Sequence, residues 1–557
     1  MRRLLSVLFL LLAPVALLVP FQPLAPSPCL AGVLDEPAAT SGVAPGNQVG
    51  TAQGADFDLL IRGARVVDGT GSPWYRADVG VRDGRIAAIG SLAEASATRV
   101  VEARDLALAP GFIDVHTHVE DEVENHPDAA NFVRDGVTTV VTGNCGGSKT
   151  DLAAFFARLE KLGLGPNLAS LVGHNSVRRK VMGSDDRRAS PDEIAAMQEL
   201  VDIAMRDGAV GLSTGLIYVP GTYAGTDEVV ALAEAAARHG GVYATHMRSE
   251  GLEIREAIAE AIEIGRRARI PVEISHFKLS SPKMWGRAEE IIGLVEQARR
   301  EGVDVAVDQY PYEWSSTGLS TTLPSWALAG GQDKLVERLR DPATRTRIAG
   351  GMAKKLKADG FRDYSYAVVA SFEPDGSIEG KSISEISRLK GRRRGVKGEI
   401  DTILQLMEQG GARMVFHKMS GDDVERILRY PNTAIASDGR VIAHGTGVPH
   451  PRSYGTNARV LGEYVRVRKV LTLEEAVRRM TSLPARTFGF SDRGLIRAGS
   501  AADLVLFDPE RVSDTATFER PHSYSVGFAL VVVNGTIVVE DDALTGARPG
   551  TILRHGQ

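Results

Sequence analysis

The middle of the chain alternates short apolar runs with longer segments whose apolar residues recur every three or four positions. The short runs predict buried parallel strands, and the longer segments predict amphipathic helices that cover them. Eight candidate strands follow one another: GFIDVHTH, TTVVTGN, LASLVGH, GAVGLSTGL, GVYATHM, PVEISHF, DVAVDQYPY and TAIASDG. This alternation predicts the α/β class and a closed (β/α)8 barrel over residues 111–480.

Two β-rich regions flank the predicted barrel. Residues 57–110 and 481–557 contain short runs that alternate polar and apolar positions between Gly-containing turns. We expect the two regions to pair into one small β-sandwich, followed by a C-terminal tail. About 120 residues separate the seventh and eighth strands, far more than a usual connection, so an inserted subdomain is predicted at about 317–430. Its basic run GRRRGVKG is typical of a solvated loop.

The N-terminus has a different composition from the rest of the chain. A basic start, MRR, precedes the apolar run from Leu4 to Phe21, which predicts a signal peptide over residues 1–30 and export to the periplasm or the cell exterior. An uncleaved membrane anchor is the alternative, because the run approaches the length of a transmembrane span. Residues 31–56 are rich in Ala, Gly, Pro and Ser and predict a flexible linker.

Charge and cysteine content narrow the classes of partner. The net charge of −5 gives no electrostatic reason to expect nucleic acid or an anionic membrane surface as a partner of the mature protein. The chain has two Cys, and Cys29 lies in the leader, so no disulfide framework is expected. Cys145 is therefore free for other chemistry, and a small-molecule substrate is the remaining expectation.

Polar side chains follow the predicted strands one after another at the same end. In a (β/α)8 barrel the catalytic groups lie at the C-terminal ends of the strands. The first strand ends in two His, the second is followed by a Cys, the fifth and sixth end in a His each and the eighth ends in an Asp. These residues are His116, His118, Cys145, His246, His276 and Asp438. Their convergence predicts a metal site at one rim.

Imidazole, thiolate and carboxylate form a ligand set that zinc prefers. A thiolate shared between two metals suits Cys145, because the second strand adjoins the first; a carboxylated Lys149, further past its strand, is the rival bridge. Water activated by zinc can attack a polarised carbonyl. Asp438 is then placed to accept the water proton and pass it to the leaving nitrogen. The alternative is that Asp438 is a structural carboxylate that caps the next segment.

Several stretches resemble the N-acyl-D-amino-acid deacylase (D-aminoacylase) family of the amidohydrolase superfamily. They are GFIDVHTH, TGNCG, GLSTGLIYVPGTYA, YATHMRSEG, EISHFK, DQYPYEWSST, ASDG, HPRSYGT and GLIRAGSAADLVLFDP. The resemblance extends over most of the chain from Phe57 to Asn534. It implies a β-sandwich beside a metal-dependent barrel, with a Cys in the bridging role that a carboxylated Lys has in other branches.

The same resemblance implies roles for individual residues. One zinc would be bound tightly by Cys145, His246 and His276, and a second, weaker site would involve His116 and His118. Asp438 would be the general acid and base in hydrolysis of an N-acyl-D-amino acid to a carboxylate and a free D-amino acid. The resemblance also implies substrate contacts by Lys278, Tyr310 and Ser316.

A substrate of this class carries a carboxylate, which a cation at the rim can orient. Arg248 and Arg452 are further candidates for that contact, with structural ion pairs as the alternative. Two other functions stay open from the sequence alone. One is a cyclic amide hydrolase of the dihydropyrimidinase or hydantoinase type, in which a Lys would bridge the metals. The other is a non-catalytic binding protein with the same fold.

Overall fold

A computed structural model describes residues 55–556 of the chain. The predicted signal peptide and nearly all of the predicted linker lie outside the described residues. Within the described part, no helix has both the length and the apolar character needed to cross a membrane.

The centre of the fold is a barrel of parallel strands, which confirms the predicted fold class. Strands such as β10, β11 and β13 are buried on both faces, because helices cover the outside and side chains fill the interior. The barrel strands are β6 (Phe112–Asp114), β7 (Val137–Thr142), β8 (Asn167–Ser170), β9 (Val172–Gly173), β10 (Gly211–Gly215), β11 (Val242–His246), β12 (Val272–Ile274), β13 (Val305–Gln309) and β17 (Thr433–Ile435).

Two short connections close this barrel. Strands β8 and β9 are separated only by Leu171, whose backbone N–H donates to the Thr142 carbonyl at 2.9 Å, so together they form the predicted third strand. On the other side, Thr117 and Gly439 form a parallel bridge that joins the ends of β6 and β17. The residues that follow both strands are therefore held side by side.

Amphipathic helices cover the outside of the barrel. In α6 the buried residues recur every three or four positions, which explains why this segment folds as a helix against the strands. Helix α4 begins with Ser190 and Glu193 in a reciprocal capping box and with Pro191 in its first turn. The covering helices are α1 (Ala130–Val133), α2 (Leu152–Leu162), α3 (His174–Met182), α4 (Pro191–Arg206), α5 (Thr226–Ala237), α6 (Ile254–Ala268), α7 (Ala288–Arg300), α12 (Gly421–Arg429), α13 (Arg452–Arg459), α14 (Leu473–Met480) and α15 (Ser482–Thr487), with a π-helix at Val460–Val467.

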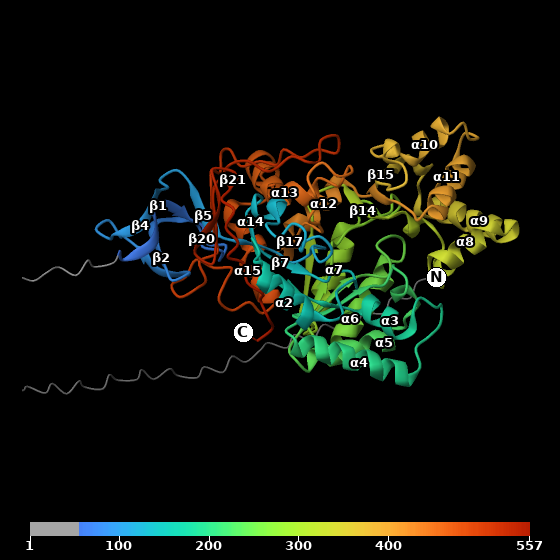
Figure 1. Ribbon diagram of the computed structural model, residues 1–557, viewed down its shortest axis with the longest axis horizontal. Coiled ribbons are helices and arrows are strands. Elements are labelled where there is room, and N and C mark those ends of the chain that lie inside the picture. Colours follow the sequence, from blue (N-terminus) through green and yellow to red (C-terminus); the bar gives the residue numbers. More distant parts are fainter. Residues whose placement is uncertain (1–54, 557) are drawn as a thin grey trace, which may run out of the picture. The chain divides into compact units, whose positions relative to one another are not determined.

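The two β-rich regions pair into one nine-stranded sheet at one side of the barrel (Figure 1). Its strands are β1 (Phe57–Val66), β2 (Tyr75–Arg82), β3 (Arg85–Gly90), β4 (Ala97–Glu102), β5 (Ala107–Pro110), β18 (Leu504–Phe507), β19 (Phe528–Val533), β20 (Thr536–Glu540) and β21 (Ala543–Leu544). Antiparallel pairing of β5 with β18 joins the two regions, and both contribute to one apolar core. The tail does not join this sheet, because Ile552 forms a parallel bridge with Leu168 in the barrel.

The inserted subdomain follows β13 and has an apolar core of its own. It contains β14 (Trp314–Gly318), α8 (Gln332–Arg340), α9 (Pro342–Asp359), β15 (Ala367–Ser371), α10 (Ile383–Leu389), α11 (Val396–Glu408) and β16 (Arg413–His417). The strands form an antiparallel sheet in the order β14-β16-β15. Helix α12 packs against α7 in the barrel instead, so the insertion spans 314–417 rather than the predicted 317–430. Residues Arg393 and Arg394 of the basic run are exposed between α10 and α11.

Candidate metal centre and substrate pocket

The strand-end residues that the sequence singled out converge at one rim of the barrel. The Cys145 sulfur lies 3.3 Å from His116 Nε2, and 3.6 Å from both His246 Nδ1 and His276 Nε2. Three overlapping groups of three residues could each hold a metal ion, because the potential ligand atoms within each group lie within 4.8 Å of one another. The groups are His116, His118 and Cys145; Cys145, His246 and His276; and His116, His276 and Asp438.

The backbone at this rim adopts conformations that L-residues rarely use. Cys145, His276 and Asp438 have φ values of +53°, +37° and +49°. Such left-handed conformations of non-glycine residues cost energy and occur often at functional sites. Next to the cysteine, Gly146 has a φ of +76°, and a Cβ there would lie 2.1 Å from Asn175 Oδ1. The turn after β7 therefore needs glycine to direct the thiol toward the histidines.

Cys145 is held as a thiolate. Burial by itself opposes the charge, but the positive charge of His116 and hydrogen bonds from the surrounding imidazoles outweigh it and hold the pKa of the thiol well below its usual value. Burial likewise opposes charge on His116, yet the negative groups beside it raise the pKa of that imidazole well above its ordinary range. The cluster thus combines an anionic sulfur with several imidazoles, the chemistry of a metal site.

The spacing of these atoms fits a tetrahedral zinc ion. Typical zinc–sulfur and zinc–nitrogen bonds of about 2.3 Å and about 2.05 Å at a tetrahedral angle place the two ligand atoms about 3.6 Å apart. The distances from Cys145 Sγ to His246 and to His276 are both 3.6 Å. These three residues therefore fit the predicted tighter site, and His116 and His118 form a second group with the same sulfur.

Asp308 contacts both His116 and His276, and it was not identified from the sequence. Its Oδ2 lies 3.0 Å from His116 Nδ1, while its Oδ1 accepts from the backbone N–H of His276 at 2.8 Å. A carboxylate on the far nitrogen of a ligand imidazole fixes the ring orientation and the tautomer. Asp308 is the fourth residue of β13, so the strand-end reasoning used for the histidines could have found it.

Glu250 and Lys278 form a buried ion pair that contacts His276. Lys278 Nζ donates to Glu250 Oε1 at 2.5 Å, and the same oxygen lies 2.8 Å from His276 Nδ1. Burial opposes charge on both groups, but each stabilises the charge of the other, so the pKa of Glu250 is lowered and that of Lys278 is raised. The sequence analysis identified Lys278 but not Glu250, whose signal is the THMRSEG run that follows β11.

Asp438 faces His118 with one oxygen and Arg452 with the other. The distances are 3.2 Å from Oδ1 to His118 Nε2 and 2.9 Å from Oδ2 to Arg452 Nη1. Burial opposes ionisation, yet the Arg452 guanidinium and the nearby imidazoles hold the pKa of Asp438 well below its usual value. Asp438 is therefore a carboxylate, placed to accept a proton beside the histidines.

Arg248 and Ser316 line the pocket, whereas Lys149 lies outside it. Arg248 forms a two-point ion pair with Glu260 at 2.9 Å and donates to backbone carbonyls, so its charge is compensated within the protein. Lys149 pairs with Asp121 at 3.4 Å on the surface, outside the histidine cluster. Ser316 lines the pocket, and its backbone carbonyl accepts from Arg452.

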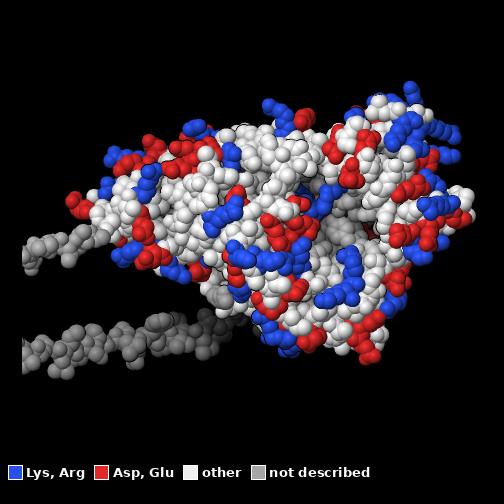
Figure 2. Space-filling view, viewed as in Figure 1, with Lys and Arg blue, Asp and Glu red and all other residues white. Residues whose placement is uncertain are grey.

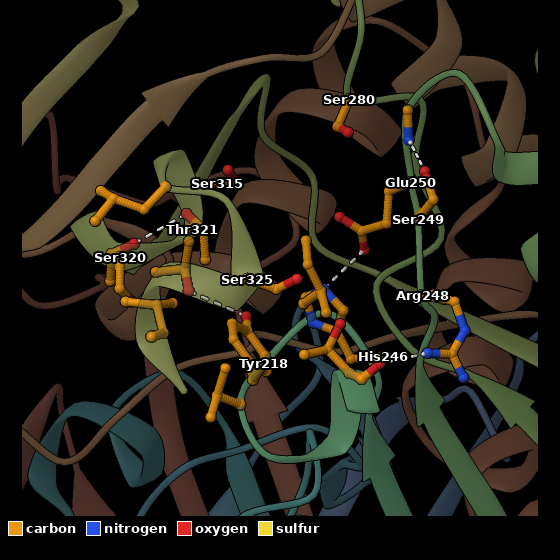
Figure 3. A pocket seen from close by; sticks show the side chains of 18 of the residues that line it. Tyr218, His246, Arg248, Ser249, Glu250, Ser280, Ser315, Ser320, Thr321 and Ser325 are labelled. Atoms are coloured by element: carbon orange, nitrogen blue, oxygen red, sulfur yellow. Dashed lines mark hydrogen bonds and ion pairs between the residues drawn. The ribbon is translucent and has the colours of Figure 1, made fainter. Parts of the chain in front are cut away.

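A pocket of about 910 Å³ opens over the rim. His246, His276, Asp438, Lys278 and Tyr310 contribute to its base, and the inserted subdomain contributes one wall. Figure 3 shows Ser315, Ser320, Thr321 and Ser325 of that wall on one side and Glu250 and Arg248 on the other, with Tyr218 and His246 between.

Tyr218 is a further pocket residue that the sequence analysis did not identify. Its ring lies 4.8 Å from the His246 ring, and its hydroxyl accepts from Thr317 at 3.0 Å. Burial and the Cys145 charge raise the pKa of the phenol well above its usual value, so it remains protonated.

The barrel and its rim together define a class: a (β/α)8 hydrolase whose strand ends present zinc-type ligands to a pocket. The sequence profile of the amidohydrolase family matches residues 99–539. D-aminoacylase of Alcaligenes xylosoxydans xylosoxydans is 38% identical over 520 residues, which cover 89% of this chain and 97% of that protein. The N-acyl-D-glutamate deacylase of the same organism is 35% identical, with coverage of 90% and 97%.

Solved structures agree with the sequence comparison. A crystal structure of D-aminoacylase superposes with a TM-score of 0.77 at 36% identity and covers 89% of this chain and 100% of that one. N-acyl-D-glutamate deacylase from Bordetella bronchiseptica, complexed with zinc and a phosphonate inhibitor, has a TM-score of 0.76 at 35% identity, with coverage of 89% and 99%. The chain belongs to the N-acyl-D-amino-acid deacylase family of the amidohydrolase superfamily. Hydantoinases, at 15–18% identity and TM-scores of 0.53–0.55, share the fold.

Proposed function

We propose that this protein is a zinc-dependent hydrolase that cleaves the amide bond of N-acyl-D-amino acids. The observation that carries the proposal is the thiolate of Cys145, with imidazole nitrogens at 3.3–3.6 Å, beside an ionised Asp438 at the base of the pocket. Relatives that are 35–38% identical over nine-tenths of the chain and are named for this activity give the substrate class and its hand.

The proposed metal residues are Cys145, His246 and His276 for the tight site, and His116 and His118 for a second, weaker site. Zinc supplies a Lewis acid that polarises a carbonyl and activates water near neutral pH. Asp308 and Glu250 keep the imidazoles of His116 and His276 in place for this task.

Asp438 moves the proton in this mechanism. Because Arg452 and the imidazoles keep it ionised, its Oδ1 can accept a proton from the attacking water. The protonated acid then donates to the amide nitrogen as the C–N bond breaks, which releases a neutral amine and regenerates the carboxylate. Tyr218, protonated beside His246, is placed to donate a hydrogen bond to the oxygen of the tetrahedral intermediate.

The substrate carboxylate is proposed to bind near Lys278, Tyr310 and Arg452. The Arg452 guanidinium lies 4.5 Å from the centre of the Tyr310 ring, and Lys278 Nζ lies 5.7 Å from it. Both cations are buried and therefore act on an anion in a medium of low dielectric. Ser316 lies on the wall from the inserted subdomain, and Arg248 lies on the opposite side of the pocket with its charge already paired with Glu260.

The experiment is hydrolysis of N-acetyl amino acids of both hands by the purified protein, with and without a chelator, alongside zinc analysis. We expect turnover of the D-enantiomers, loss of this activity when the chelator removes the metal, and recovery of the activity when zinc is added back. Cys145→Ala should lose zinc and activity, whereas Lys149→Ala, the matched control for a lysine-bridged cyclic amide hydrolase, should retain both. Activity that survives complete metal removal, or that is restricted to L-substrates, would contradict the proposal. Purified protein without zinc would favour the non-catalytic alternative.

We also propose a small molecule as the partner of the mature protein. Lys and Arg intermingle with Asp and Glu on the face drawn in Figure 2, where neither sign forms a large continuous field. Export to the periplasm or the cell exterior is proposed from the leader in the sequence, with an uncleaved membrane anchor as the alternative. N-terminal sequencing of the mature protein from fractionated cells would distinguish cleavage from anchoring.

A further inference from the structure

A lysine that directly follows the last strand of the inserted subdomain lines the substrate pocket. Lys418 follows β16 directly and is partly buried. Its backbone is fixed, because its N–H donates to the Glu313 carbonyl and its carbonyl accepts from the Trp285 indole at 3.0 Å. The ammonium lies 4.4 Å from the centre of the Phe416 ring and 5.8 Å from that of Tyr366. Two aromatic rings and an anchored backbone thus hold the charge at the pocket.

Most other cations of the pocket already have an acidic partner. Lys278 pairs with Glu250, Arg248 with Glu260 and Lys355 with Asp359. Arg179, at the exposed outer edge, donates to the Val219 carbonyl. Lys418 differs: among residues 55–556, no carboxylate lies within ion-pair distance of its ammonium, and no hydrogen bond satisfies it.

Lys418 is a partly buried cation without an ion-pair partner among the described residues. Burial and the nearby Lys355 charge lower the pKa of Lys418 to about 8, against the partial compensation of Asp359 and Glu250. The ammonium is therefore still charged at pH 7. A partly buried charge without a partner is costly to keep, and a bound anion would remove that cost.

We propose that Lys418 binds a second carboxylate on the substrate, so that the preferred substrates are N-acyl derivatives of acidic D-amino acids. This inference rests on the proposed function. The α-carboxylate has its own cations in Lys278 and Arg452 near Tyr310, on the barrel side. Lys278, Tyr310 and Lys418 line the same pocket, so a dianion bound there can contact cations from both the barrel and the wall.

The surrounding wall suits a polar side chain. Ser315 and Ser320 line the same pocket, and their hydroxyls can donate hydrogen bonds to a carboxylate that Lys418 orients. A pocket of about 910 Å³ has room for the acyl group as well.

The test compares kcat/KM for N-acetyl-D-glutamate with that for N-acetyl-D-glutamine, a near-isosteric neutral substrate. We expect the wild type to prefer the acid about 10- to 100-fold, the size of one desolvated charge-assisted hydrogen bond. Lys418→Met should bring the ratio near one, because it removes the charge that favours the acid. Lys418→Arg should keep the preference. Lys355→Met, which removes a neighbouring charge that Asp359 already pairs with, should keep it as well.

A ratio near one in the wild type, with good turnover of the glutamine and methionine derivatives, would overturn this inference and leave the proposed function intact. A ratio that Lys418→Met leaves unchanged would do the same. If Lys418→Met instead selectively lowers turnover of N-succinyl-D-methionine relative to N-butyryl-D-methionine, the lysine faces the acyl group and the assignment is wrong. Failure to hydrolyse any of the D-substrates would refute the proposed function and the inference together.

Discussion

The barrel rim and the wall that the inserted subdomain contributes differ in how their polar groups are partnered. At the rim, Asp308, Glu250 and Arg452 each support a neighbouring site residue, so most charges are matched within the protein. The wall has hydroxyls from a subdomain with its own apolar core, and directly after that subdomain comes Lys418, whose ammonium has no ion-pair partner among residues 55–556. The difference indicates that the rim residues carry out the chemistry, whereas the wall residues select which substrates bind.

The largest effect expected at the rim comes from Asp438→Asn. The amide keeps the shape but cannot accept the water proton, so kcat/KM should fall about 10²–10⁴-fold. Zinc content should stay unchanged, because Asp438 is proposed to transfer protons rather than to hold the tight metal. Steady-state kinetics together with metal analysis check this, and near-normal turnover would show that another group moves the proton.

A smaller loss is expected for Asp308→Asn. The carboxylate of Asp308 orients His116 and holds the backbone N–H of His276, and removal of such support typically costs about 10–100-fold in metal affinity or activity. Titration of the metal-free variant with zinc measures the metal affinity. Asp121→Asn, at a surface ion pair with Lys149, is the matched control and should leave zinc affinity unchanged. Equal losses in the two variants would mean that the effect is not specific to the rim.

The wall should show a pH effect that the rim does not. The pKa of Lys418 is about 8, so its charge is present below that pH and is lost as the pH rises through it. The charged groups that act on it are Lys355, Asp359, Glu250 and Lys278. Glu250 has a lowered pKa and Lys278 a raised one, so both keep their charges in this range. The glutamate-to-glutamine ratio of kcat/KM should therefore fall between about pH 7 and pH 9, and Lys418→Arg should give a flat profile. A flat wild-type profile would contradict the role of Lys418.

The smallest effect on the reaction is expected from the core of the insertion. Ile403 is fully buried there, and Ile403→Ala should lower the free energy of unfolding by about 2–5 kcal/mol. Turnover of N-acetyl-D-methionine and zinc content at 25 °C should change little, because the chemistry lies on the barrel. Thermal unfolding and metal analysis test this, and loss of zinc in a folded variant would show that rim and wall are not separable.

The fold could be predicted from the sequence because its signal is local. Apolar runs predicted all eight barrel strands, and the long interval between the seventh and eighth runs predicted the insertion. The segment of α12 was wrongly assigned to the insertion. The insertion boundary was missed because α12 resembles any amphipathic helix, and only its packing against α7 places it in the barrel. The C-terminal tail was predicted, but its pairing with the barrel at Leu168 was not, for the same reason.

The site was only partly predictable. Residues at strand ends could be grouped, because the strand direction places them at one rim. Glu250 and Tyr218 lie in loops, and their approach to the histidines depends on loop paths that no periodic pattern encodes. Arg248 illustrates the converse: its sequence position suggested a substrate contact, but Glu260, one helix further along the chain, compensates its charge.

The central claim is that the thiolate of Cys145 is a metal ligand. The most direct measurement is the absorption spectrum of the cobalt-substituted protein, because a thiolate bound to Co²⁺ gives a charge-transfer band that imidazole and carboxylate ligands do not. We expect this band in the wild type and its loss in Cys145→Ser, with cobalt still bound at the histidines or absent. A cobalt-loaded wild type without the band, or a band that persists in Cys145→Ser, would contradict the account.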